Sequence, residues 1–169
     1  MEYDVIVVGG GPAGASAAYF NAVEGRKVLL FEKAVFPRDK ICGDGVTGKA
    51  LGILEEMGLS EGIADIKKIS CQEVILSSPN QTILNIPIAS PDDPFTSFCI
   101  EREVFDDLLY QKAVATVLEN GGTVINEKVS QPLIEDGVMV GVIANKQEYR
   151  ASLIVGADGF NGPISRYVM

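Results

Sequence analysis

Three glycines near the start of the chain have the spacing of a phosphate-binding turn. Gly9, Gly11 and Gly14 occupy the glycine positions of the pattern G-x-G-x-x-G. The first glycine permits a tight reversal from strand to helix, the second lets backbone approach a pyrophosphate, and the third lets helix pack on strand. Pro12 and Ala13 lie within the turn, and proline suits the first helical position, where its missing N–H is no loss. We therefore predict a pyrophosphate site at this turn.

A carboxylate follows at the distance expected for ribose recognition. Glu32 ends the next apolar run, and a carboxylate there accepts hydrogen bonds from a ribose 2′-OH and 3′-OH. An acidic residue disfavours a 2′-phosphate, so NADP is not expected at this turn. The alternative is a glycine turn without a ligand, which requires all these contextual features to coincide by chance. We predict a site for the ADP half of a dinucleotide, and the turn alone does not separate FAD from NAD.

These residues need a strand, a helix and a second strand to position them. The β-branched run Val5–Val8 predicts a buried strand, and the alanine-rich segment Ala13–Val23 predicts a helix that ends near Gly25. Lys27–Phe31 predicts a second buried strand. Together they form a βαβ unit with parallel strands and a right-handed crossover.

The rest of the chain does not continue the βα alternation. We expect a loop over 33–46 and then helices over 47–57 and 101–120. We expect strands over 74–78, 82–88, 123–126, 129–134, 138–144 and 148–152, a buried strand over 153–155, and an irregular connection over 90–95. The Asp136-Gly137 turn lies in a three-stranded meander formed by 129–134, 138–144 and 148–152.

Composition excludes several classes of function. The chain has 169 residues and a formal net charge of −9, which disfavours nucleic-acid binding. It has no histidine, which excludes a Ser-His-Asp triad and a His-ligated metal, and we predict no metal site. Three dispersed cysteines without a CxxC motif fit a reducing cytoplasm. Its apolar runs are too short to span a bilayer, so we expect a soluble, cytoplasmic protein.

Four motifs in order resemble a known family. They are residues 9–18, residues 36–45 with the Cys42-Gly43 pair, residues 100–106 with Arg102, and Gly156-Ala157-Asp158-Gly159 followed by Ser165-Arg166. The chain resembles glutathione-reductase-like flavoproteins, and within them the p-hydroxybenzoate hydroxylase and geranylgeranyl reductase group. Asn161-Gly162 departs mildly from the family's usual Asn-Ser.

The resemblance implies the fold class and the cofactor. The fold is α/β, a Rossmann-like FAD/NAD(P)-binding domain of the glutathione-reductase type with a β-meander. Residues 1–64 and 101–169 would form an incomplete FAD-binding domain, and 65–100 the start of a substrate-domain β-sheet. The cofactor is FAD, with NAD(P)H as a candidate electron donor. The cofactor-binding residues implied by turn and resemblance together are Gly9, Gly11, Pro12, Ala13, Gly14, Glu32, Lys33, Cys42, Gly43, Arg102, Val129, Asp158 and Gly159.

Residue chemistry alone leaves alternatives at three of these positions. Arg102 has charged neighbours and fits a solvated helix start as well as a cofactor contact. Asp158 fits a turn before Gly159, and Cys42 fits an inert packing residue. We assign no catalytic residue, because no side chain is a convincing acid or base.

The resemblance implies an FAD-dependent oxidoreductase whose reduced flavin delivers a hydride to a carbon–carbon double bond of an isoprenoid-like, lipid-like substrate. The alternatives are a flavin-dependent monooxygenase, and a truncated FAD- or ADP-binding module without turnover. The family's returning Gly-Asp motif does not occur before Met169, so we expect a fragment with an incomplete isoalloxazine site. Peripheral membrane contact is compatible with this assignment, and the sequence leaves the oligomeric state open.

Overall fold

The computed structural model describes residues 2–42, 44–88 and 97–168. The chain divides into two compact units, the first formed by Met1–Arg38 with Asp106–Met169 and the second by Asp39–Phe105. The second unit begins earlier than the insert expected over 65–100. The assignment of that insert to a substrate domain remains a prediction.

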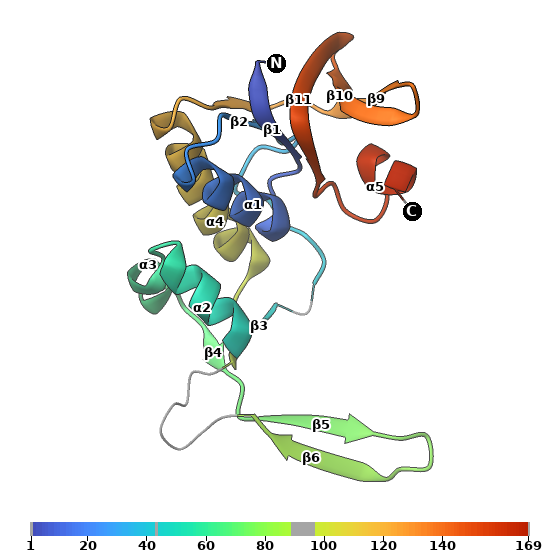
Figure 1. Ribbon diagram of the computed structural model, residues 1–169. Helices are drawn as coiled ribbons and strands as arrows, with labels where there is room; N and C mark the ends of the chain where they lie inside the picture. Colours follow the sequence, from blue (N-terminus) through green and yellow to red (C-terminus); the bar gives the residue numbers. More distant parts are fainter. Residues whose placement is uncertain (1, 43, 89–96, 169) are drawn as a thin grey trace. The chain divides into compact units, whose positions relative to one another are not determined.

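The first unit is built on a six-stranded sheet with strand order β8-β2-β1-β11-β10-β9 (Figure 1). Its strands are β1 (Tyr3–Val8), β2 (Val28–Phe31), β8 (Thr123–Ile125), β9 (Val129–Glu135), β10 (Val138–Ala144) and β11 (Gln147–Gly156). β1 pairs in parallel with β2 and β11, and β2 pairs in parallel with β8. With helix α1 (Pro12–Val23) between β1 and β2, the predicted βαβ unit is confirmed.

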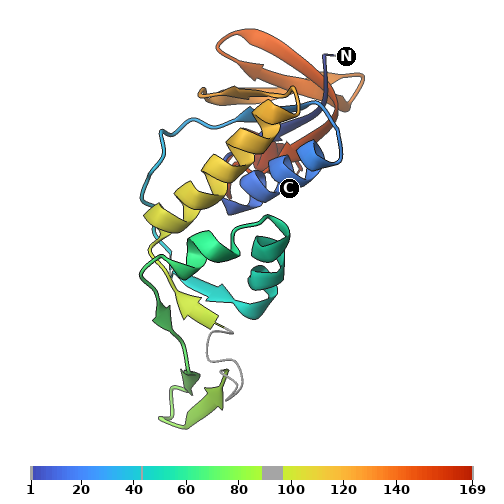
Figure 2. The ribbon, with the colours of Figure 1, turned by 90° about the vertical axis from the view of Figure 1, so that its left-hand side faces the viewer.

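The centre of the sheet is buried because its strands carry apolar side chains toward both faces. All four residues of β2 are buried, as are the last four residues of β1, Val5–Val8. Helix α1 and helix α4 (Arg102–Glu119) lie side by side on one face of the parallel strands β8, β2, β1 and β11, and the meander strands β9 and β10 lie toward the other face (Figures 1 and 2). The turn after β1 therefore lies between a central strand of the sheet and helix α1.

The last strand differs from the prediction. Separate strands were expected over 148–152 and 153–155, but β11 runs without interruption from Gln147 to Gly156. It pairs antiparallel with β10 and parallel with β1, so it joins the meander to the parallel sheet. Residues 150–155 contain no glycine, proline, asparagine or aspartate, which explains the continuity. Leu153 is also 50% exposed, so the expectation that 153–155 is buried was wrong at this residue.

The second unit contains short elements that periodicity does not detect. A three-stranded sheet has the order β3-β7-β4, and β5 pairs with β6 in a separate hairpin. The elements are β3 (Gly45–Thr47), α2 (Gly48–Glu56), α3 (Ser60–Ala64), β4 (Ile69–Ser70), β5 (Glu73–Ser77), β6 (Ile83–Pro87) and β7 (Ser97–Cys99). The predicted helix over 47–57 and the predicted hairpin are confirmed. The connection expected over 90–95 lies outside the described residues.

Candidate cofactor-binding site

The glycine turn is crowded where it meets the end of β11. Gly9 has φ +103°, a left-handed conformation that favours glycine. A Cβ on Gly9 would collide with the carbonyl oxygen of Ala157, and one on Gly14 would collide with the carbonyl oxygen of Gly9. The Gly9 N–H donates to the Phe31 carbonyl at 2.7 Å, which ties the turn to β2. The tight reversal and the close helix–strand packing expected of these glycines are both present.

The turn leads directly into the N-terminus of α1. Gly11 occupies the N-cap and has no side chain with which to cap the helix, while Pro12 takes the first helical position. The N–H groups of the first turn therefore remain available to an anion, and the helix dipole favours negative charge there. The atom nearest to a Cβ placed on Gly11 would be Nη2 of Arg38, at 3.4 Å. A guanidinium thus lies beside the glycine whose backbone is predicted to approach a pyrophosphate.

Arg38 is held in this position by a buried carboxylate and an aromatic ring. Its Nη1 lies 3.1 Å from Oδ2 of Asp106, whose side chain is fully buried. Its guanidinium lies over the Phe36 ring at 4.8 Å, and Phe36 stacks on Tyr110 at 4.2 Å between ring centroids. No motif in the sequence predicts a role for Arg38 or Asp106 by itself. Their ion pair joins segments far apart in the chain, so local sequence patterns do not reveal it. The one signal in the sequence is that each residue lies within one of the motifs that resemble the family, residues 36–45 and 100–106.

Tyr110 closes the other side of the turn. A Cβ on Gly10 would lie 2.7 Å from Cε2 of Tyr110, so the ring packs directly on the glycine backbone. Burial raises the pKa of the Tyr110 hydroxyl, and the negative charge of Glu32 raises it further. The ring therefore stays neutral at physiological pH and acts as a packing surface.

Glu32 connects the turn to the loop after β2. Its carboxylate is 6% exposed and accepts hydrogen bonds from the Gly10 N–H at 2.5 Å and the Ala34 N–H at 2.7 Å. Asn126 steadies the same loop, because its Nδ2 donates to the carbonyls of Glu32 and Ala34 at 2.8 Å each. A carboxylate has about four acceptor positions, so the two amides leave capacity for a ribose. The ribose contact itself remains a prediction.

The Asp158 side chain forms hydrogen bonds with the segment that follows it. Its carboxylate accepts hydrogen bonds from the Ile164 N–H at 2.7 Å and the Ser165 hydroxyl at 2.5 Å, and so caps helix α5 (Pro163–Val168). A Cβ on Gly9 would lie 3.1 Å from the Asp158 backbone nitrogen, so this motif borders the glycine turn. Gly159 has φ +77°, which favours glycine. Helix α5 was not predicted, because six residues are too few for a clear apolar period.

The remaining predicted site residues are dispersed. Val129 begins β9 with its side chain buried in the hydrophobic core, and Lys33 is exposed. Cys42 is exposed and Arg102 is half-buried, and both belong to the second unit. Gly43 lies outside the described residues. A role in cofactor binding remains a prediction for each of these five.

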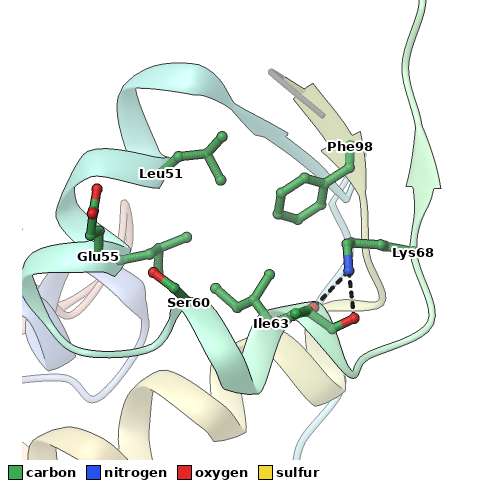
Figure 3. A pocket seen from close by; sticks show the side chains of 8 residues that line it. Leu51, Glu55, Ser60, Ile63, Lys68 and Phe98 are labelled. Carbon is green, nitrogen blue, oxygen red and sulfur yellow. Dashed lines mark hydrogen bonds between the residues drawn. The ribbon is translucent and has the colours of Figure 1, made fainter. Parts of the chain in front are cut away.

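The second unit has an apolar pocket of its own. Its volume is about 470 Å³, and it is lined by Leu51, Leu54, Glu55, Ser60, Ile63, Ala64, Lys68 and Phe98. Figure 3 shows the side chains of Leu51, Ile63 and Phe98 pointing toward the hollow. Lys68 donates to the Ile63 and Ala64 carbonyls at 2.8 and 2.9 Å. Its ammonium group therefore caps the end of α3. Most of the other residues that line the pocket are apolar.

The parallel sheet, the glycine turn at a helix N-terminus and the acidic end of β2 define a dinucleotide-binding protein of the Rossmann type. The family model of the FAD binding domain matches residues 2–168. The chain belongs to this family, which confirms the predicted fold class and FAD as the cofactor. In the described residues, no helix has both the length and the apolar character needed to cross a membrane.

Curated relatives and solved structures agree with this family. The chain is 33% identical over 172 residues to digeranylgeranylglycerophospholipid reductase 1 of Methanopyrus kandleri, covering 98% of this chain and 42% of the relative. It is 32% identical over 176 residues to menaquinone reductase of Mycolicibacterium smegmatis, covering 96% of this chain and 39% of the relative. A triple mutant of the flavin-dependent brominase Bmp2 superposes with a TM-score of 0.80 at 28% identity, and the match covers 98% of this chain and 41% of the brominase chain. The chain thus spans about two fifths of the length of these relatives.

The residues at the turn fit the ADP half of FAD. The uncapped first turn of α1 and the Arg38 guanidinium offer N–H donors and positive charge, as a pyrophosphate requires. The carboxylate of Glu32 offers the acceptors that ribose hydroxyls require.

Proposed function

We propose that this chain is part of an FAD-dependent oxidoreductase that reduces a carbon–carbon double bond of an isoprenoid-like substrate. One observation carries the proposal: the resemblance to digeranylgeranylglycerophospholipid reductase extends over nearly the whole chain. The apolar pocket in the second unit is chemically compatible with a lipid-like ligand. Peripheral membrane contact is compatible with such a substrate. We also propose a reducing cytoplasm as the location, which three cysteines far apart in the sequence and without a CxxC motif support.

In this proposal the protein binds and orients the cofactor. When reduced and bound, FAD supplies the hydride, with NAD(P)H as the proposed source of electrons. The first turn of α1 and Arg38 would neutralise the pyrophosphate, and Glu32 would hold the ribose. The Gly9 and Gly14 contacts keep the turn close to the sheet, so that backbone N–H groups as well as Arg38 would face the pyrophosphate.

A second candidate is an oxygen-dependent flavoenzyme, the monooxygenase-type alternative. The similarity to a flavin-dependent brominase favours it, since the two share this fold at 28% identity. A third candidate, a binding module without turnover, retains the ADP site but lacks catalysis.

The test combines binding with turnover. The purified chain is mixed with FAD and desalted, and its flavin spectrum is recorded. It is then reduced with dithionite without oxygen and incubated with a lipid that carries geranylgeranyl chains. We expect the chain to retain flavin. Where the isoalloxazine site is complete, we also expect product about 2 Da heavier for each double bond reduced, as two hydrogens are added.

The outcomes separate the candidates. Flavin retention without alkene reduction, in a chain that oxidises NAD(P)H only when oxygen is present, would favour the monooxygenase-type alternative. Retention without any turnover would favour the binding module. Tight NAD binding without flavin retention would overturn the site assignment itself.

A further inference from the structure

Two cysteines far apart in the sequence meet in the second unit. Cys71 follows β4, and Cys99 ends β7. Their Sγ atoms lie 3.4 Å apart, in contact with each other. Both side chains are half-buried, so a small reagent can reach them. In the sequence the two cysteines are 28 positions apart, and no CxxC motif joins them.

The backbone holds the two thiols together. β4 and β7 pair antiparallel, with Ile69 opposite Cys99 and Ser70 opposite Phe98. The Cys71 N–H donates to the Ser97 carbonyl at 2.9 Å and extends this pairing by one more residue. The contact between the sulfurs is therefore set by the strand register and does not depend on a chance meeting of flexible loops.

We propose that Cys71 and Cys99 form a dithiol site that a small-molecule disulfide, such as oxidised glutathione, converts reversibly to an intramolecular disulfide. The bond would link β4 to β7 and close the segment that contains the β5–β6 hairpin. Cys99 lies opposite Ile69 in this register and is therefore diagonal to Cys71, so bond formation must bring the sulfurs from 3.4 Å to the roughly 2.0 Å of a disulfide. The site is separate from the glycine turn and does not depend on the proposed function.

The reaction proceeds by two exchanges. One protein thiolate attacks oxidised glutathione, whose S–S bond breaks as a mixed disulfide forms and one glutathione thiolate leaves. The second cysteine gives its proton to solvent and attacks the protein sulfur of the mixed disulfide, releasing the second glutathione. Two electrons pass from the protein to glutathione.

Geometry and acidity favour Cys99 for the second step. Hydrogen bonding with Cys71, and then burial, raise the pKa of the Cys99 thiol. Cys99 therefore keeps its proton to a higher pH than an ordinary cysteine thiol, whereas the first attack requires a thiolate. Once the mixed disulfide has formed on Cys71, the adjacent Cys99 attacks it within the same molecule.

The chain carries an internal control for the test. Trypsin releases residues 69–102 as one peptide, because this segment has no Lys or Arg before Arg102, and it contains both cysteines. Cys42 falls in the separate peptide 41–49. The reduced, folded protein is treated with oxidised glutathione, alkylated with iodoacetamide, digested and weighed. The same treatment in urea tests whether the fold is required.

We expect the peptide 69–102 to become about 2 Da lighter and to lose both alkyl groups, while Cys42 stays alkylated or carries glutathione. Dithiothreitol should restore both alkyl groups, and the Cys42→Ser variant should behave the same way. In urea, the preference for a disulfide within the peptide 69–102 should disappear. Glutathione retained on Cys71 or Cys99, or two alkyl groups on 69–102 while Cys42 reacts, would overturn the proposal. So would a disulfide that forms only between two chains on a non-reducing gel.

Discussion

At the scale of single residues, Glu32 combines two tasks at the glycine turn. It accepts hydrogen bonds from Gly10 and Ala34, and we propose that it also binds the ribose. Glu32→Ala should weaken FAD binding by about 1.5 to 3 kcal/mol, the loss expected when charge-assisted hydrogen bonds are removed. Fluorescence titration of FAD measures this loss, with Glu24→Ala, an exposed carboxylate after α1, as the matched control. Unchanged affinity would show that the carboxylate is not at the ribose.

Arg38 and Asp106 form the second residue-scale unit of the site. Arg38→Ala removes the ion-pair partner of a fully buried carboxylate, which should lower the free energy of unfolding by about 3 kcal/mol. Urea denaturation measures the loss. In the double variant Arg38→Ala/Asp106→Asn, the carboxylate that would lose its ion pair is replaced by a neutral amide. We therefore expect the double variant to be more stable than Arg38→Ala alone, and additive losses would show that the two groups are not coupled.

At the scale of elements, the close approach of α1 to β1 depends on Gly14. A Cβ there would collide with the Gly9 carbonyl, so Gly14→Ala should destabilise the chain by about 1–3 kcal/mol and weaken FAD retention. Gly52→Ala is the matched control, because Gly52 lies within α2 and a Cβ added there would meet no heavy atom of the described residues within 4 Å. That change should stabilise by about 0.5–1 kcal/mol. Thermal denaturation gives both values, and equal effects would contradict the packing role of Gly14.

At the scale of the whole molecule, the β5–β6 hairpin presents an apolar face. Leu76 pairs with Leu84 and Val74 pairs with Ile86, and all four side chains are substantially exposed. An exposed apolar two-stranded hairpin favours association. The double variant Leu76→Lys/Leu84→Glu should keep the pairing through opposite charges and reduce concentration-dependent light scattering. Asn85→Lys, on the other face, is the control, and equal scattering from all three proteins would contradict this prediction.

Local spacing was sufficient to predict the glycine turn, the βαβ unit, the Asp136-Gly137 hairpin and the helix before β8. Each depends on turn chemistry or on apolar periodicity within one stretch of chain. The short elements β3, β4, β7, α3 and α5 escaped prediction, because two to six residues carry too little periodic signal. The boundary within β11 was misplaced, because one strand changes its pairing partner without a change in sequence pattern.

The sequence by itself therefore determined the class of ligand, through the spacing of Gly9, Gly11 and Gly14 and the position of Glu32. Only the tertiary structure decided that Arg38 stands beside Gly11, that Asp158 caps α5, and that Cys71 meets Cys99. The physical reason is the range of the interactions. A turn and a helix start are specified by neighbouring residues, whereas an ion pair or a thiol contact between distant segments depends on strand register and core packing.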